Sequence, residues 1–375
     1  MKKFSLLILI SLLLISCGKK VEIAVYNDTN FKRENEMVDL CLCSLKNKIG
    51  LKVGDKIIIL DSNHKQVPYQ MLSDSMTVIF PVTVGAKDSS KYTILIGKPD
   101  SIVTKTFGRH VPERKDDFAW ENDRIAFRMY GPKLAAENPS NGVDVWLKRT
   151  ENLIVNKFYK DDLAGKQSYH VDNGEGLDCY KVAHTLGAGG IAPYIDTILF
   201  VGSYYNKYNI LEKGPLRTVF QLLYDSVKIG DRTIKEKLVI TVDAGNQLNK
   251  ATVEYEDKSK TKMQVAAGIF LHDSIGTPVS EPKKGYIAYA ENAVSDAGVP
   301  SGRSYVGVII PTPIDTVITK QKHLLAISNY RADRPFIYYF GAGWSKWGFP
   351  KDKDWFDYME KATLKIKHPL RIIVK

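Results

Sequence analysis

The sequence lacks the motifs of several common enzyme classes. It contains no P-loop, no dinucleotide-binding GxGxxG between a strand and a helix, and no GxSxG nucleophile elbow. Gly187-Ala188-Gly189-Gly190 is rich in glycine, but it lacks the lysine and the following helix of a phosphate-binding loop. We therefore expect no nucleotide cofactor. Segments with a helical period are also scarce, which argues against an α-helical fold.

The first 17 residues have the pattern of a targeting segment. Lys2 and Lys3 precede the apolar run Phe4–Ile15, which is too short to span a bilayer comfortably as a mature helix. Leu14-Ile15-Ser16-Cys17 resembles the bacterial lipoprotein box, and this resemblance implies cleavage before Cys17 and lipidation of that residue. Several acyl chains would hold the protein stably to a membrane. A simple cleaved secretory peptide is the alternative.

The residues after Cys17, Gly18-Lys19-Lys20, carry no acidic run. In lipoproteins of the Bacteroidetes type such a run is associated with display on the cell surface. We therefore expect a cell-envelope lipoprotein whose membrane anchor faces the periplasm, and surface display stays open.

The chain is basic, with a formal net charge of +11 that falls by two when Lys2 and Lys3 are removed. The field of a basic exported protein attracts acidic partners. Nucleic acid is not expected, because the sequence has no Lys/Arg-rich block, no RNA-binding aromatic motif and no zinc-finger spacing. Acidic glycans are the better partner. The alternative is that the charge only keeps the protein soluble.

Cysteine is rare, with 4 residues in the chain. If Cys17 carries lipid, Cys41, Cys43 and Cys179 remain, and three thiols cannot all pair. Cys41 and Cys43 would point to the same face of a strand, where a bridge between them would be strained. We predict no disulfide framework and no CxxC metal site, and we expect all three thiols to be free and buried.

Strand patterns dominate the mature chain. Short apolar runs at Lys56–Leu60, Met76–Val84 and Lys91–Ile96, separated by turn residues, predict a small antiparallel β-sandwich at 18–105. From 106 to 375 the strands follow in long succession without βαβ alternation, which predicts a large antiparallel two-sheet sandwich. The clearest of these strands are Arg124–Tyr130, Thr218–Tyr224, Lys237–Val242, Gln247–Tyr255, Lys262–Leu271, Tyr286–Ala290, Ser304–Ile310, Leu324–Tyr330 and the closing Leu370–Val374. One helix is predicted at Trp355–Thr363, with Asp354 as its N-cap.

Four motifs carry a resemblance to a known family. They are Trp120–Arg128 followed by Tyr130-Gly131-Pro132, the stretch His170–Gly190, Gly214-Pro215-Leu216-Arg217, and Tyr339–Trp347. Together they resemble an uncharacterised family, a domain of unknown function, of exported Bacteroidetes lipoproteins that is associated with polysaccharide degradation. The resemblance covers nearly all of the mature chain and implies a β-supersandwich like that of galactose mutarotases and many polysaccharide lyases. It implies no mechanism, and fold alone does not decide chemistry.

The stretch Ser168–Gly190 holds the densest group of reactive side chains. His170 with Tyr180 or His184 could transfer protons, as a uronate lyase requires of its base and its acid. A lyase also needs a cation that neutralises the substrate carboxylate, and Arg109, Arg114 and Arg217 are the candidates. The alternatives are a structural role for His184 and a strand-end salt bridge for Arg217.

Carboxylates in and near this stretch allow other chemistry. Glu121 with Glu175, or Asp172 with Glu175, could form the acid pair of a glycoside hydrolase. A sugar epimerase could use His170, His110 and Glu121 as base and acid. Asp172, Glu175 and Asp178, near His170, offer oxygen ligands that suit Ca²⁺, although their spacing is not that of an EF-hand. Otherwise these acids bond loop amides and a sugar.

Aromatic side chains could provide platforms for the C–H faces of sugars. The candidates are Trp120, Trp146, Tyr204, Tyr205, Trp344 and Trp347, of which we expect at least half to be core residues. A turn at Gly341-Ala342-Gly343 is expected to expose Trp344. The residues predicted to bind substrate are Arg109, His110, Arg114, Trp120, Asn122, Lys181, Tyr205, Arg217 and Trp344, and those predicted to be catalytic are His170, Tyr180, His184 and Glu121.

These observations predict an exported lipoprotein enzyme that acts on uronate-containing glycans by β-elimination. A glycoside hydrolase or sugar epimerase acting on the same glycans is the alternative enzyme. A noncatalytic glycan-binding lipoprotein is the alternative of a different class. The single-site hypothesis requires His170, Glu121 and Arg217 to lie together.

Overall fold

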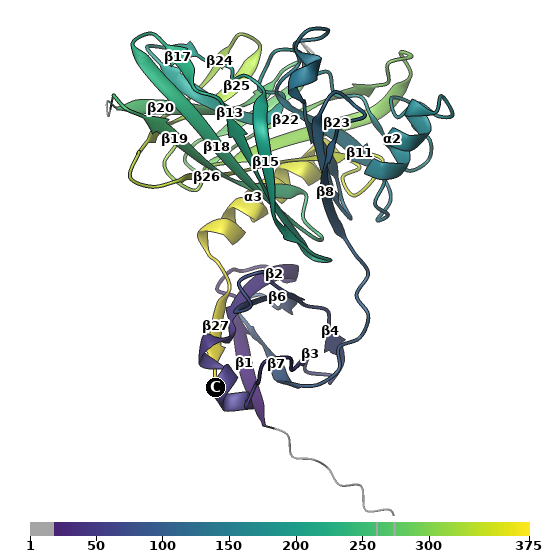
Figure 1. Cartoon of the computed structure of the whole chain (residues 1–375), viewed down its shortest axis with the longest axis vertical. Coiled ribbons are helices and arrows are strands. Elements are labelled where there is room, and N and C mark those ends of the chain that lie inside the picture. Colours follow the sequence, from purple (N-terminus) through teal and green to yellow (C-terminus); the bar gives the residue numbers. More distant parts are fainter. Residues whose placement is uncertain (1–18, 260–261, 273–274) are drawn as a thin grey trace, which may run out of the picture.

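The computed structural model describes residues 19–259, 262–272 and 275–375. The predicted signal peptide and the lipid-bearing Cys17 lie outside the described residues. Antiparallel strands in five sheets make up most of the regular secondary structure of the described chain, which confirms the prediction of an all-β sandwich fold. Figure 1 shows a small lobe and a large lobe, joined by an extended linker on one side and by the end of a long helix on the other. Within the described ranges, no helix is both long and apolar enough to cross a membrane.

The small lobe is a β-sandwich with its own apolar core. Its sheets have the strand orders β27-β1-β7-β3-β4 and β2-β6-β5. The residues that fill the core between them include Ile23, Ile59, Phe80 and Ile94, all with no exposed surface. The strands are β1 (Lys20–Tyr26), β2 (Arg33–Cys41), β3 (Ile57–Leu60), β4 (Gln66–Val67), β5 (Gln70–Met71), β6 (Thr77–Val84), β7 (Ser89–Ile96) and β27 (Arg371–Val374), with the short helix α1 (Lys46–Ile49).

The last strand of the chain belongs to the small lobe. Residues of β27 pair with β1 from Ile23↔Val374 to Tyr26↔Arg371. The prediction that 106–375 forms one domain is therefore wrong for this strand. Its apolar pattern indicates a strand, but no local pattern shows that its partner lies at the opposite end of the chain.

Cys41 and Cys43 form a disulfide, so the prediction of free thiols is wrong for this pair. The prediction assumed a strand, but the chain leaves β2 at Cys41 and turns at once into the 3₁₀ helix Leu42–Ser44. The turn brings the two Cα atoms to 5.4 Å, a separation typical of disulfides. Cys179 is a free, partly buried thiol.

The large lobe packs two smaller sheets against one face of a long sheet. The long sheet has nine strands: β15 (Tyr205–Lys213), β16 (Arg217–Tyr224), β17 (Val227–Ile229), β18 (Arg232–Asp243), β19 (Leu248–Asp257), β21 (Thr277–Glu281), β22 (Tyr286–Val294), β23 (Pro300–Ile309) and β26 (Phe336–Trp344). One smaller sheet has β8 (Thr106–Val111), β9 (Asp117–Asn122), β10 (Ala126–Met129), β11 (Val143–Lys148) and β12 (Gly176–Asp178). The other has β13 (Ala188–Ile195), β14 (Ile198–Leu199), β20 (Met263–Phe270), β24 (Thr316–Lys320) and β25 (His323–Tyr330).

A single apolar core joins these three sheets. Phe127 and Leu177 from the β8–β12 sheet, Ile269 from the β13–β25 sheet, and Phe220 and Phe340 from the long sheet all belong to it. Strand β16 shows why the sequence folds this way. Every second side chain from Thr218 to Tyr224 is buried in the core, and those between them are partly exposed.

Helix α3 (Asp352–Lys367) covers the opposite face of the long sheet. Trp355 and Met359 pack there on Tyr305 and Ala288. The helix is longer than predicted and begins earlier, because its N-cap is Lys351. Asp354 is instead the third helical residue, and its carboxylate accepts a hydrogen bond from the Lys351 backbone at 2.9 Å.

A second helix, α2 (Val155–Leu163), was not predicted. It begins without a side-chain cap at Ile154 and buries Val155, Phe158 and Tyr159. These side chains cover the outer face of the β8–β12 sheet, where they meet Trp146. This sheet is therefore buried on both faces.

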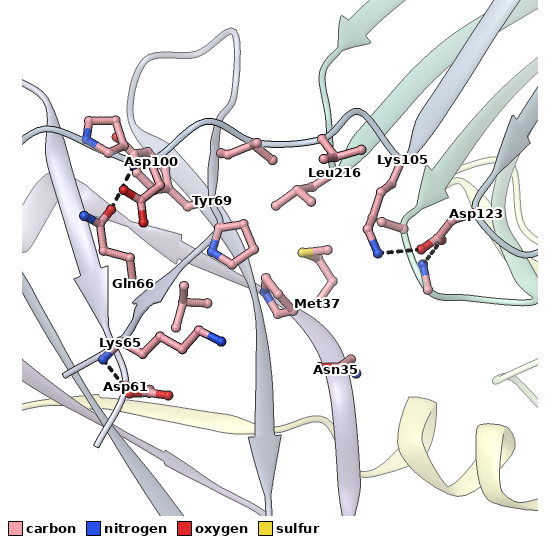
Figure 2. Close-up of a pocket in the computed structure, with 18 of the residues that line it drawn as sticks. Asn35, Met37, Asp61, Lys65, Gln66, Tyr69, Asp100, Lys105, Asp123 and Leu216 are labelled. Carbon is pink, nitrogen blue, oxygen red and sulfur yellow. Dashed lines mark hydrogen bonds and ion pairs between the residues drawn. The ribbon is translucent and has the colours of Figure 1, made fainter. Parts of the chain in front are cut away.

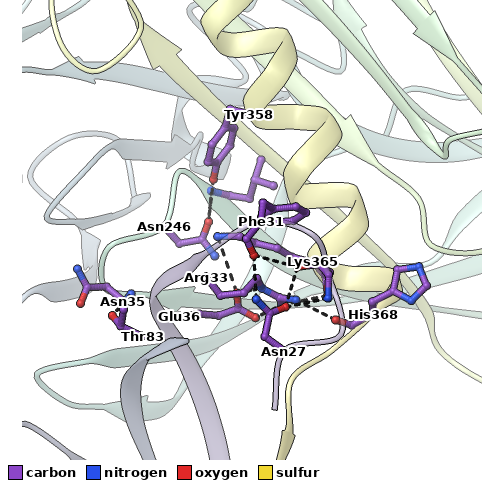
Figure 3. Close-up of polar contacts among 12 residues, drawn as sticks. Asn27, Phe31, Arg33, Asn35, Glu36, Thr83, Asn246, Tyr358, Lys365 and His368 are labelled. Atoms are coloured by element: carbon purple, nitrogen blue, oxygen red, sulfur yellow. Dashed lines mark hydrogen bonds and ion pairs between the residues drawn. The ribbon is translucent and has the colours of Figure 1, made fainter. Parts of the chain in front are cut away.

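Polar contacts fix the two lobes to each other (Figure 3). Arg33 of β2 is fully buried and pairs with Glu36. It also donates to the carbonyl of His368, just after α3, at 2.9 Å. Elsewhere along the interface, Arg217 of β16 contacts Asp39 of β2 at 2.8 Å and Asp243 of β18 at 2.6 Å.

Candidate functional site

A row of buried charges crosses the outer face of the β8–β12 sheet. Arg128 of β10 lies directly opposite Asp144 of β11 in the strand register. Its Nη2 is 2.7 Å from Asp144 Oδ2 and 2.8 Å from Asp178 Oδ2, on β12. Its Nη1 is 3.9 Å from Asp117 Oδ2, on β9. All four side chains are almost completely buried, and we call them the Arg128 row.

Aromatic rings enclose the Arg128 row. The guanidinium carbon of Arg128 lies 4.7 Å from the ring centre of Tyr130, 5.3 Å from Trp146 and 5.7 Å from Tyr169. Tyr169 in turn stacks on Trp146 at 4.9 Å. The rings exclude water, and a weakly polarisable environment strengthens every charge interaction inside it.

The Arg128 row contains three carboxyl groups and only one cation, the Arg128 guanidinium. Burial raises the pKa of Asp144, and the nearby charge of Asp178 raises it further. Burial also raises the pKa of Asp178 and Asp117, although Arg128 opposes the rise in each case. Asp144 Oδ1 and Arg128 Nε are buried with no hydrogen-bond partner among the described residues. Among the three aspartates of the row, Asp144 is therefore the one whose protonated form burial favours most.

His170 connects this buried row to solvent. Its side chain is 33% exposed, and its Nδ1 lies 3.6 Å from Asp178 Oδ2 and 3.5 Å from Asp296 Oδ2. The same nitrogen is 3.1 Å from the backbone oxygen of Asp178. The tautomer with hydrogen on Nδ1 satisfies this contact and leaves the Nε2 lone pair to accept a proton. This is the geometry of a histidine base held in place by a backbone carbonyl, with two carboxylates close to the same nitrogen.

Three cationic side chains pair with carboxylates that lie close to His170 in space or in sequence. Lys181 is 3.8 Å from Asp296 and 73% exposed. Asp172, two residues after His170, lies between Arg149 at 3.1 Å and Lys346 at 3.2 Å. We call Lys181, Arg149 and Lys346 the cationic rim. Both Arg149 and Lys346 lie over the ring of Trp344, at 5.9 and 5.2 Å.

A close backbone approach shapes the loop that carries His170. Gly176 has a φ of +148°, and a Cβ atom there would stand 2.1 Å from the carbonyl oxygen of Leu147. Only glycine allows this contact, because any side chain would collide with β11. The glycine therefore allows β12 to lie against β11, which brings Asp178 beside Arg128.

The predicted metal ligands do not converge. Asp172 pairs with Arg149, Glu175 with Lys157, and Asp178 with Arg128. Across the described ranges, no three histidine, cysteine or acidic residues are grouped so that they could hold a metal ion.

Two predicted catalytic residues are held in structural positions. Glu121 is buried against Lys148 at 2.8 Å, and its carboxylate accepts hydrogen bonds from the first amides of α2, those of Ile154 and Val155. Tyr180 is also buried, and its hydroxyl donates to the carbonyls of Gly187 and Phe270. Neither side chain faces solvent. Because His184 is exposed, it is a suitable control for His170.

Several residues predicted to bind substrate are also buried. Trp120 and Trp344 are core residues whose Nε1 atoms donate to Asn249 and Ser301. The turn expected at Gly341-Ala342-Gly343 is absent, because these residues lie within β26. Buried Tyr205 donates to the carbonyl of Asp116. Buried Asn122 donates to the carbonyls of Asp243 and Asn246.

The predicted carboxylate-binding arginines already have acidic partners. Arg217 contacts two aspartates at the lobe interface, which supports its structural alternative. Arg109 pairs with Glu113 at 2.5 Å, and Arg114 lies 3.7 Å from Asp117 at the edge of the Arg128 row. His110 lies 3.5 Å from Asp116 and stacks on Tyr208 at 4.8 Å.

His170, Glu121 and Arg217 therefore do not form the predicted single site, since each has a separate set of partners. Lys181 and Asp178 do lie beside His170. The sequence reasoning missed Arg128, Asp144, Asp296, Arg149 and Lys346. A signal for the first two was present, because a charge in the middle of an apolar strand requires a buried partner.

Comparisons with known proteins place the chain in a wider group. Residues 25–372 match a family model described as "Domain of unknown function (DUF4861)". A protein of Formosa agariphila named "Uncharacterized protein P7" is 29% identical over 286 residues, which cover 72% of this chain and 70% of that protein.

Two solved structures share the fold. One is a protein in glycosyl hydrolase family 38 from Enterococcus faecalis and the other is an alpha-mannosidase from the same organism. Each superposes with a TM-score of 0.52 at 8% identity over 95% of this chain. The chain spans less than half of their length, 47% and 46%. At this identity the likeness concerns the fold alone.

Proposed function

We propose, for a chain that belongs to the DUF4861 family of unknown function, that it is an enzyme acting on uronate-containing oligo- or polysaccharides by β-elimination. The observation that supports this proposal is the position of His170. Its Nδ1 is held by Asp178, its side chain reaches solvent, and the cationic rim lies beside it. These are the parts that proton abstraction next to a carboxylate requires.

In the proposed reaction the cationic rim binds the uronate carboxylate. Its positive charge stabilises the negative charge that develops when the neighbouring carbon loses a proton. His170 Nε2 takes that proton, the electron pair forms the new C=C bond, and the glycosidic C–O bond at the next carbon breaks. The leaving oxygen takes a proton from water, because the predicted acid Tyr180 is buried. Asp178 acts as a positioning residue, since it orients the imidazole and stabilises its cation.

The test follows ultraviolet absorbance from the new C=C bond on a panel of uronate glycans. We expect His170→Ala to lower kcat/KM at least about 100-fold, the range of general base catalysis. His184→Ala is the matched control, because it removes an exposed histidine of the same segment. New reducing ends without absorbance would show hydrolysis instead. Binding without any product would show a noncatalytic glycan-binding protein.

The proposed location is the cell envelope, with a lipid on Cys17 as the membrane anchor. The lipoprotein box at Leu14–Cys17 supports this proposal. Metabolic labelling with a radioactive fatty acid is expected to mark the wild-type protein and not Cys17→Ser. Labelling of both proteins, or of neither, would contradict the proposed anchor.

A further inference from the structure

A cavity of ≈ 610 Å³ lies between the two lobes (Figure 2), and none of the residues that line it belongs to the His170 site. The small lobe provides Tyr69, Met37 and Lys65, and the large lobe provides Arg124 and Leu216. The linker 99–103 forms another part of the wall. Its volume is typical of sites that hold small organic ligands, and such sites are common at domain interfaces.

The linker side of the cavity is held by hydrogen bonds. The linker amide of Asp100 donates to Gln66 Oε1 at 3.0 Å, and the Gln66 amide donates to the carbonyl of Lys98 at 3.4 Å. At the other end of the linker, the amide of Lys105 donates to the carbonyl of Pro215 at 2.8 Å. A ligand would therefore meet a preformed wall, which lowers the cost of ordering on binding.

An apolar cluster closes the edge of the cavity between the lobes. Ile79 from the small lobe packs there with Leu216 and Ala244 from the large lobe, and Met37 and Ile102 lie against them. Leu216 is fixed further, because its amide donates to Gln70 Oε1 of β5 at 2.9 Å. The cavity is thus a fixed feature of the lobe interface.

The charges that line the cavity are balanced. Three cations, Lys65, Lys105 and Arg124, face three carboxylates, Asp61, Asp100 and Asp123. Lys105 and Asp123 contact each other at 3.0 Å, and Arg124 also has a partner, Glu151, at 3.4 Å. An anionic sugar would gain little from such a lining, because each added attraction is offset by a carboxylate. The cationic rim beside His170 is also paired, but there three cations share two carboxylates, Asp172 and Asp296.

The remaining lining suits a ligand with hydroxyl groups and apolar faces. Tyr69, Met37 and Val67 provide apolar surface, together with three prolines. The Lys65 ammonium donates hydrogen bonds and the Asp100 carboxylate accepts them, and both side chains are exposed. Hydroxyl groups do both, and the C–H faces of a sugar ring pack against aromatic and apolar side chains.

We propose that this cavity binds a short neutral saccharide. The proposal goes beyond the reaction at His170 and does not depend on it. The bound saccharide would be a neutral part of a glycan, held by the lobe interface while an acidic part is free to reach another site. The small lobe then contributes to ligand binding as well as to the stability of the fold.

Isothermal titration calorimetry of the full chain with short neutral gluco-, galacto-, manno- and xylo-oligosaccharides tests the proposal. At least one of them is expected to bind. Tyr69→Ala should weaken binding about tenfold, which corresponds to about 1.4 kcal/mol, and Lys65→Met should weaken it by a smaller factor. Lys91→Met is the matched control, because Lys91 is an exposed lysine of the same lobe outside the cavity.

Tyr69→Ala removes buried surface and could reduce stability, so Lys65→Met, at an exposed residue, provides the second variant. His170→Ala is expected to bind the neutral saccharide as the wild type does, even where it abolishes turnover of uronate glycans. The proposal is overturned if no neutral saccharide binds, or if Tyr69→Ala and Lys65→Met bind it as tightly as Lys91→Met. Binding that His170→Ala abolishes would place the saccharide at the other site and would also overturn the proposal.

Discussion

Glu236 provides a sharp test of the electrostatics inside the large lobe. It lies on β18 between the inward-facing residues Ile234 and Leu238, and it lines two small cavities of ≈ 40 and ≈ 100 Å³. Burial raises the pKa of its carboxyl group from 4.5 to about 8. Glu236 is therefore expected to be protonated at neutral pH in the folded protein.

The sign of the effect follows from the two protonation states. Between pH 4.5 and pH 8 the folded protein holds a proton on Glu236 that the unfolded chain has released. Stability therefore falls as pH rises through this window, by about 1.4 kcal/mol for each pH unit. The full shift predicts a loss of about 4 kcal/mol between about pH 5 and pH 9. Glu236 keeps some exposed surface, which eases ionisation, so we expect a loss of about 2–4 kcal/mol.

Glu236→Gln removes this loss, because the amide is nearly isosteric with the protonated acid and does not titrate. Urea unfolding between about pH 5 and pH 9 should show that the variant exceeds the wild type in stability by a margin that grows with pH. Glu254→Gln is the control, since Glu254 pairs with Lys237 on the exposed face of the same sheet. Such a pair contributes about 1 kcal/mol or less. Parallel stability curves for wild type and Glu236→Gln would refute the reasoning.

Three further predictions concern the candidate site and its scaffold. Arg128→Met leaves Asp144 and Asp178 without the cation that pairs with both of them, and urea unfolding at pH 7 should show a loss of about 3–5 kcal/mol. Glu121→Ala leaves Lys148 buried and unpaired and removes the acceptor for the first amides of α2, so the same assay should again show a loss of about 3–5 kcal/mol. Gly187→Ala would place a Cβ 2.2 Å from a backbone oxygen, so its melting temperature should fall more than that of Gly174→Ala, where the same atom meets nothing within 4 Å. Equal melting temperatures for these two variants would contradict the steric argument.

The strands that the sequence predicts best are those with one face in the core. Strand β16 alternates between buried and partly exposed residues from Thr218 to Tyr224, and this alternation identifies it. Strands β9 and β11 were missed. Every residue of each is buried, since their outer face lies beneath α2 and Tyr169, so burial does not alternate along them. Strand β10 is equally buried, but its segment Arg124–Tyr130 alternates in sequence and was predicted. The pairing of β27 with β1 was also beyond local reasoning, because only the assembled small lobe brings the two chain ends together.

The candidate site also has residues that a local sequence pattern identifies and residues that only the tertiary structure brings together. His170 and Asp178 were predicted because they belong to one dense polar segment, and the structure places them in contact. Arg128 and Asp144 come from separate strands, and only the strand register places them opposite each other. Asp296 reaches His170 from a turn more than a hundred residues later. The density of polar residues in one segment therefore identified the exposed part of the site. Its buried part, Arg128 and Asp144, could be identified only from the tertiary fold.

Burying the charges of the Arg128 row has a free-energy cost, and this cost indicates a role other than stability. Taking one arginine and three aspartates out of water costs several kcal/mol for each ion, and a well-packed apolar cluster of similar volume is often equally or more stable. Stability alone therefore does not account for these charges. Their geometric consequence is local, because Arg128 fixes Asp178, whose backbone oxygen bonds the His170 ring and whose carboxylate lies 3.6 Å from it. The desolvation cost of the Arg128 row is accounted for if the row holds the partly exposed imidazole of His170 in a fixed tautomer and orientation.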